Sequence, residues 1–199
     1  MIKRLLFFTV IATGAYLAFT PSSVEHAPGV LVDNAPQQSE ATRHTPFSHK
    51  GFQLTPLADF QLQARVLGTE NYSLGRESEL SPLDLALGWG PMSDSAVLEQ
   101  IDITQGGRFY HWSAKRLPVP RTTIISHSAN MHMVPADSAV ERELKRLRRG
   151  DIISLQGELI RADAPDGWHW VSSMTRDDSG NGACELVWVR EVALLDPSQ

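Results

Sequence analysis

Residues 137–160 read DSAVERELKRLRRGDIISLQGELI and carry the clearest secondary-structure signals in the chain. A helix is expected to begin at Asp137, because apolar side chains recur at i, i+4 and i+7 on one face: Val140, Leu144 and Leu147. Arginines near its end complement the helix dipole, and Gly150 stops it. The next ten residues read as a strand with Gly157 near its centre, which is typical of a bulge or a sharp bend. The stretch therefore predicts a helix that leads directly into a bent strand.

The sequence that follows predicts more strands. Residues 164–167 (APDG) form a turn, and two further strands are expected over 168–174 and 184–193. Three consecutive strands after a helix predict a small antiparallel sheet or barrel. The run 149–157 has the look of an OB-like strand, an analogy that fixes no function. We therefore expect an α+β fold with short helices and an antiparallel, partly barrel-like (OB-like) C-terminal sheet.

The preceding sequence contains shorter elements. Alternating apolar and polar residues over 60–66 predict a half-buried strand. Ser81, as a capping residue, and Pro82, at a first helical position, predict a short helix that ends at Gly88. A second short helix, an aromatic strand and an extended segment are expected further on, over residues 94–101, 108–112 and 122–133 respectively.

Residues 1–20 (MIKRLLFFTVIATGAYLAFT) carry Lys3 and Arg4 near their start and continue as an uncharged, mostly apolar stretch from Leu5 to Phe19. This is the pattern of a secretory signal or a transmembrane signal anchor. The shortness of the stretch favours a cleaved signal, whereas the lack of a clean small-x-small cleavage site favours an uncleaved anchor. We expect a cell-envelope protein that is anchored in the inner membrane with its domain in the periplasm, or secreted if the segment is cleaved.

The remaining chain divides into a linker and one domain. Residues 21–50 are rich in Pro, Ser, Ala, Gln and His and show no sustained periodicity, so a flexible linker is expected. Residues 51–199 are expected to form a single globular α+β domain, in keeping with a chain of 199 residues.

Charge and cysteine content limit the possible functions. The net charge of -5 provides no field that would attract a polyanion, so no nucleic-acid partner is expected. Cys184 is the only cysteine and cannot form an intramolecular disulfide. On an extended strand His127 and His132 would point to opposite faces, and no loop matches a calcium-binding pattern. Neither a metal nor a cofactor is expected.

Two groups of side chains are candidates for ligand binding. If residues 126–132 are extended, alternate polar side chains share one face: Ser126, Ser128, Asn130 and His132. Trp168 and Trp170 share a strand face in the same way, as aromatic platforms for sugars or peptides do. The alternatives are the solvated face of an edge strand for the polar row and core packing for the tryptophans.

A catalytic interpretation centres on Cys184. A neighbouring histidine, His132 or His169, would take the thiol proton and activate the cysteine for a cell-wall hydrolase or transferase reaction. Residues 179–184 are weakly similar to the S-x-G-C element of L,D-transpeptidases, but Ala183 precedes the cysteine and no HG motif stands upstream. The alternative is that Cys184 is a small buried hydrophobic residue.

Three segments carry a wider resemblance: 86–92 (ALGWGPM), 128–136 (SANMHMVPA) and 172–188 (SSMTRDDSGNGACELVW). In them the chain resembles a family of bacterial envelope proteins of no established activity. The resemblance implies an N-terminal hydrophobic segment before one domain and nothing about chemistry. From the residues we expect a membrane-tethered extracytoplasmic binding or assembly module with a protein, peptide or glycan partner. The Cys184-dependent enzyme remains the alternative.

Overall fold

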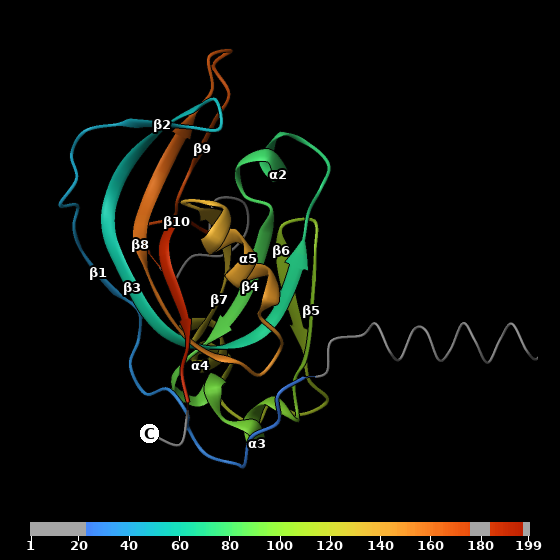
Figure 1. Cartoon of the computed structure of the whole chain (residues 1–199). Coiled ribbons are helices and arrows are strands. Elements are labelled where there is room, and N and C mark those ends of the chain that lie inside the picture. Colours follow the sequence, from blue (N-terminus) through green and yellow to red (C-terminus); the bar gives the residue numbers. More distant parts are fainter. Residues whose placement is uncertain (1–22, 176–183, 197–199) are drawn as a thin grey trace, which may run out of the picture.

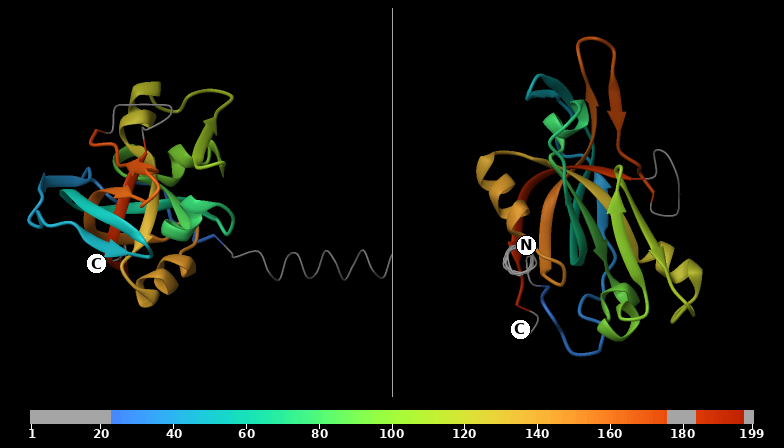
Figure 2. Two further views of the ribbon diagram at one scale, coloured as in Figure 1. Left: turned by 90° about the horizontal axis from the view of Figure 1, so that it is seen from above. Right: turned by 90° about the vertical axis from the view of Figure 1, so that its right-hand side faces the viewer.

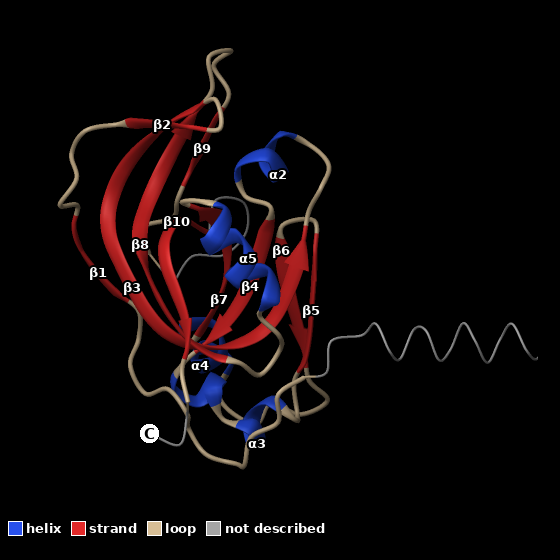
Figure 3. Cartoon of the chain, in the orientation of Figure 1, coloured by secondary structure: helices blue, strands red, loops and turns tan. Residues whose placement is uncertain are grey.

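The computed structural model describes residues 23–175 and 184–196 of the chain. These residues form a mixed α/β fold with a large, mostly antiparallel sheet and a few short helices (Figure 3). The expected α+β class is confirmed at this level. The expected membrane or signal segment, 1–20, lies outside the described residues. Within the described ranges, no helix is long and apolar enough to cross a membrane.

The strands and helices alternate irregularly along the chain. The strands are β1 (Gln37–Glu40), β2 (Phe47–His49), β3 (Phe52–Asn71), β4 (Leu83–Gly88), β5 (Asp102–Gly106), β6 (Phe109–Ser113), β7 (Ser128–Pro135), β8 (Ile152–Asp163), β9 (His169–Val171) and β10 (Glu185–Leu194). The helices are α2 (Arg76–Leu80), the 3-10 turn η1 (Gly90–Ser93), α3 (Ser95–Leu98), α4 (Arg121–Ser126) and α5 (Ser138–Arg146).

The main sheet is built around two long, curved strands, β3 and β8, which pair side by side (Figure 1). From β3 the pairings run through β4, β7 and β10 to β8, and β8 pairs in turn with β3. The strands β7 and β10 run parallel, while the other described pairs are antiparallel. A separate hairpin is formed by β5 and β6.

Helix α5 packs on the sheet beside β7 and β10 (Figure 2). Its apolar face is the predicted one, since Val140, Leu144 and Leu147 all enter the largest hydrophobic cluster. The side chain of Asp137 caps the helix by accepting hydrogen bonds from the backbone N–H groups of Ala139 and Val140, at 2.7 and 2.9 Å. A regular apolar period and a cap agree here, so local sequence and tertiary packing specify the same helix.

Within the expected flexible linker, 21–50, the structure shows two short strands and a few fixed contacts, while most of its other described residues are non-regular and exposed. Residues 37–40 and 47–49 are strands that pair with β3. Val32 is buried in the main core, and the backbone N–H of Val24 donates to the carbonyl of Arg149 at 2.8 Å. Polar residues join a sheet edge through backbone hydrogen bonds, which leave no hydrophobic period in the sequence.

Two expected elements upstream of α5 also differ. The helix predicted to end at Gly88 is strand β4, in which Leu83, Leu85 and Leu87 face the main core on alternate positions. The extended segment predicted over 122–133 divides into helix α4 and strand β7. The strands in both places, β4 and β7, are buried on both faces. In such strands the alternation of side chains is a stronger signal than a short sequence that resembles a helix cap.

Candidate functional site

A buried carboxylate joins β4 and β7. Asp84 has no solvent exposure, and its Oδ1 lies 2.9 Å from Nδ1 of His132, which stands directly opposite it in the strand register. The Nδ2 group of Asn130 donates to the other oxygen, Oδ2, at 3.3 Å. Because a carboxylate only accepts hydrogen bonds, Nδ1 of His132 carries the proton and Nε2 is the remaining ring nitrogen.

Arg108 also forms an ion pair with the carboxylate of Asp84. It lies with Gly107 in the two-residue turn between β5 and β6, and both residues have positive φ, 60° for the glycine and 72° for the arginine. Its Nη1 donates to Oδ1 of Asp84 at 2.8 Å, and its guanidinium lies 3.8 Å from the ring centroid of Tyr72. Two-residue hairpin turns favour positive φ at both central residues, so the turn itself holds Arg108 in this conformation.

The backbone of Arg108 is also held in place. Its N–H donates to the hydroxyl of Tyr72 at 3.1 Å, and its carbonyl accepts from Nδ2 of Asn130 at 3.2 Å. The Sγ atom of Cys184 lies 3.9 Å from the same carbonyl. Burial raises the pKa of Tyr72, so this hydroxyl stays protonated at neutral pH.

A cavity of about 390 Å³ opens beside this cluster and is lined by Glu77, Gly107, Arg108, Phe109, His132, Trp170 and Cys184. The rings of His132 and Trp170 meet with their centroids 4.7 Å apart. His132 is 4% exposed, and its Nε2 has no hydrogen-bond partner within residues 23–175 and 184–196. The cavity therefore combines an aromatic wall with an oriented imidazole, which is the composition of a small-ligand pocket.

The predicted polar row is partly present. Ser128, Asn130 and His132 alternate on β7 as expected, and His132 lines the cavity. The Oγ of Ser128 instead donates to the carbonyl of Ile124 at 2.7 Å and lies within hydrogen-bond distance of the Tyr110 hydroxyl, at 2.8 Å. Its hydrogen bonds therefore have a structural role. Ser126 belongs to α4 and lies apart from this row, with its Oγ 2.9 Å from Nδ1 of His127.

The two predicted tryptophans are neighbours, with ring centroids 6.2 Å apart. Trp170 lines the cavity, while Trp168 packs edge-on against Phe52 at 5.6 Å. His169 is exposed on β9 between them and is not among the residues that line the cavity. Of the two histidines considered as a base for Cys184, His132 is therefore the one that shares its cavity.

Sequence reasoning missed the charged partners of the site: Asp84, Arg108 and Glu77. Asp84 lies in LDLALG, where alternation marks a strand and places it on the face opposite the leucines. Arg108 directly follows Gly106-Gly107, a hairpin-turn signal, but nothing local indicates that the turn folds onto β4.

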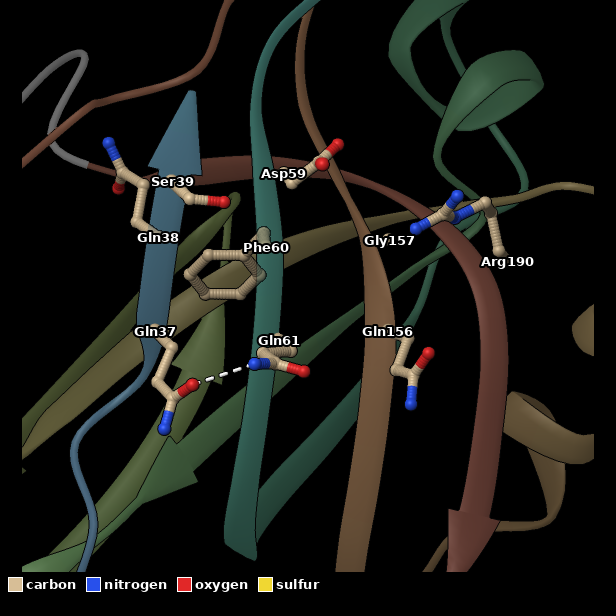
Figure 4. A pocket seen from close by; sticks show the side chains of 9 residues that line it. All are labelled: Gln37, Gln38, Ser39, Asp59, Phe60, Gln61, Gln156, Gly157 and Arg190. Carbon is tan, nitrogen blue, oxygen red and sulfur yellow. Dashed lines mark hydrogen bonds between the residues drawn. The ribbon is translucent and has the colours of Figure 1, made fainter. Parts of the chain in front are cut away.

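A second hollow, of about 300 Å³, lies on the outer face of β1, β3 and β8. Figure 4 shows Gln37, Gln61 and Gln156 side by side on these strands, with Nε2 of Gln61 donating to Oε1 of Gln37 at 2.7 Å. Asp59 and Arg190 line the same hollow. No aromatic platform accompanies the amides, because Phe60 is only 2% exposed. The cavity at His132 is therefore the stronger candidate.

Comparison of the chain with protein-family models, with curated proteins and with solved structures finds no match to any of them.

Proposed function

We propose that this protein is a membrane-tethered extracytoplasmic binding module, non-enzymatic, whose cavity at His132 and Trp170 takes a short peptide or glycan segment. The observation that carries the proposal is the cavity itself, in which an oriented imidazole faces an aromatic wall. The hydrophobic residues 1–20 support the tether and a location in the cell envelope.

The strand pairings support an OB-like, partly barrel-like arrangement. The pairings of β3, β4, β7, β10 and β8 form a closed series, since β8 pairs with both β10 and β3. The helix α5 stands between β7 and β8 in the chain, and β7 runs parallel to β10. In OB-folds the second and third strands carry the ligand face. Their counterparts are β4 and β7, the strands of Asp84 and His132.

The chemistry of the cavity favours a ligand that donates hydrogen bonds. Asp84 neutralises Arg108, so the guanidinium supplies little net attraction for an anion. In the neutral imidazole with its proton on Nδ1, Nε2 of His132 is an acceptor, as is the carboxylate of Glu77, while Trp170 and Phe109 supply apolar faces. Sugar hydroxyls and peptide N–H groups donate hydrogen bonds, and both belong to molecules that also have less polar surfaces. Sugars and peptides therefore suit a cavity that combines acceptors with aromatic faces.

Cys184 provides a direct test, because it lines the cavity. The probe is a soluble disaccharide-peptide fragment of peptidoglycan, which carries both glycan and peptide groups. We expect saturating fragment to slow the alkylation of Cys184 by iodoacetamide in the full-length protein. A fragment that binds without slowing alkylation would place the ligand elsewhere, and the absence of binding would oppose this choice of ligand class.

The second candidate function is a Cys184-dependent cell-wall hydrolase or transferase. One arrangement favours it: Cys184 and His132 line one cavity, and Asp84 holds the other ring nitrogen of His132. Nε2 of His132 would accept the thiol proton, and the thiolate would attack an amide carbonyl carbon. The C–N bond would then break as the imidazolium protonates the leaving amine. Water, or an acceptor amine, would release the acyl group from sulfur.

The two candidates differ in their response to Cys184→Ala. Binding of the peptidoglycan fragment should persist in this variant if the protein is a binding module. Turnover of the fragment by the wild-type protein, lost in Cys184→Ala with binding retained, would establish the enzyme instead. Mass spectrometry of the fragment after incubation distinguishes these outcomes.

A further inference from the structure

Arg65, on β3, is a buried charged residue outside the cavity at His132. This residue is 8% exposed, and its strand neighbours are Gly88 on β4 and Ile152 on β8. Its Nη1 donates to the carbonyl of Ser93 at 2.9 Å and to Oγ of Ser95 at 2.8 Å. Both acceptors are neutral. Within the described ranges, no carboxylate lies within 4.0 Å of this guanidinium.

A buried charge without a countercharge is costly, and such charges are usually paired. Burial lowers the pKa of Arg65, and the nearby positive charge of Arg149 lowers it further, while Asp94 and Glu25 partly oppose this effect. A further anion beside the two arginines would offset more of this cost.

A cavity of about 150 Å³ offers a place for such an anion, since both Arg65 and Arg149 line it. Its outer wall is the segment 23–26, which is fixed to the turn before β8. Nε2 of His26 donates to the carbonyl of Gly150 at 2.8 Å, and the backbone at Val24 bonds to Arg149. The volume suits a small polar molecule or headgroup.

The same cavity is also lined by two exposed carboxylates, Glu25 and Glu99. A simple anion would be repelled by them, whereas a zwitterion satisfies both pairs of charges. A phosphate would accept from Arg65 and Arg149, and an ammonium would donate to the glutamates. Phosphoethanolamine, a phosphate joined to a primary amine by a two-carbon spacer, is a small and common group with this pattern.

We propose that this cavity binds a phosphoethanolamine group. The group occurs free in solution and as the headgroup of phosphatidylethanolamine. The lipid source rests on the proposed membrane tether, because only two residues separate segment 23–26 from the hydrophobic residues 1–20. The lipid headgroup would then lie where the chain leaves the bilayer.

The test uses soluble O-phosphoethanolamine and inorganic phosphate as probes, titrated into the full-length protein in maltoside detergent by calorimetry. We expect phosphoethanolamine to bind at least about tenfold more tightly than phosphate. Arg149→Gln should weaken its binding about tenfold, and Glu99→Gln should remove the preference over phosphate. Both residues are exposed, so folding should be unaffected, and Arg142→Gln on α5 is the matched control.

Absence of saturable phosphoethanolamine binding, or equal loss in Arg142→Gln, would overturn the proposal. Equal affinity for both probes would show a plain anion site and would also overturn it. Nanodiscs separate the two sources. If the lipid occupies the site, soluble phosphoethanolamine should bind in phosphatidylcholine nanodiscs and fail to bind in phosphatidylethanolamine nanodiscs. Equal binding in both assigns the site to a soluble ligand. These soluble-probe results do not depend on the cavity at His132, so either proposal can fail alone.

Discussion

The imidazole of His132 is held by the carboxylate of Asp84 across two neighbouring strands, with Nδ1 and Oδ1 2.9 Å apart. The two residues are directly opposite in the register of β7 and β4, so the backbone pairing itself sets their approach. Arg108 approaches the same oxygen from the β5–β6 turn. Asp84, Arg108 and His132 thus form one connected group beside the cavity.

Removing the shared carboxylate should destabilise the protein. In Asp84→Ala, the buried His132 and the half-buried Arg108 would lose their common partner. We expect a loss of about 3–5 kcal/mol in the free energy of unfolding, measured by urea denaturation. Asp102→Ala, which alters an exposed aspartate on β5, is the control and should change stability little. A loss in Asp84→Ala no larger than that control would contradict the connected group.

The close contact at Gly150 should be sensitive to a single methyl group. Gly150 has φ of 98°, and a Cβ there would lie 1.9 Å from the carbonyl oxygen of Val24. We expect Gly150→Ala to cost more than about 1 kcal/mol and to release segment 23–26, seen as faster proteolysis. Gly106→Ala is the control, since a Cβ at that glycine meets nothing within 4 Å. Unchanged proteolysis in Gly150→Ala would show that the segment is not fixed there.

The packing of α5 can be tested at Leu144, which is fully buried in the main core. Leu144→Ala should reduce the free energy of unfolding by about 2–5 kcal/mol, because it removes buried methyl groups and leaves a cavity. Leu117→Ala, at a leucine that is 46% exposed, should have a much smaller effect. Similar losses in the two variants would argue against this core.

The cap of α5 predicts a pH dependence at low pH. Backbone N–H groups of Val140 and Ala139 donate to Asp137 and hold the pKa of its carboxyl below the usual value. The ionised cap therefore stabilises the fold above the unfolded-state pKa of about 3.9, and this contribution is lost as pH falls through the lower folded-state pKa. Asp137→Ser keeps a side-chain acceptor without this titration.

We expect the stability difference between the wild-type protein and Asp137→Ser to change as pH falls through that range and to be constant above it. Thermal denaturation at a series of pH values provides the measurement. A difference that stays constant down to the lowest pH would mean that Asp137 does not titrate differently in the folded and unfolded states.

The features that sequence predicted are those with a local period. Helix α5 has both an apolar face and a following glycine, and the alternation of Ser128, Asn130 and His132 survives in β7. Asp84 was missed because Ser81-Pro82 reads as a helix start, although LDLALG alternates as a strand. A helix-start signal involves two residues, whereas burial on both faces of a sheet is decided by distant segments.

The remaining features depend on contacts that leave no local pattern. Arg108 joins the site only because the β5–β6 turn folds onto β4. Arg65 lies in a strand whose alternating sequence does not indicate that another segment buries this side chain. The strands in residues 23–50 form through backbone groups that every residue possesses. Long-range packing therefore determines the positions of Arg108 and Arg65 and the path of the N-terminal segment.

Trp170 provides the most direct test that the cavity at His132 binds the ligand. Equilibrium binding of the disaccharide-peptide fragment should be measured by calorimetry on the full-length protein, Trp170→Ala and Trp112→Ala. Trp112 is the control because it lies on β6, where its ring contacts Arg121, and does not line the cavity. We expect Trp170→Ala to weaken binding at least about tenfold and Trp112→Ala to leave it unchanged. Equal binding by all three proteins would contradict the proposed site.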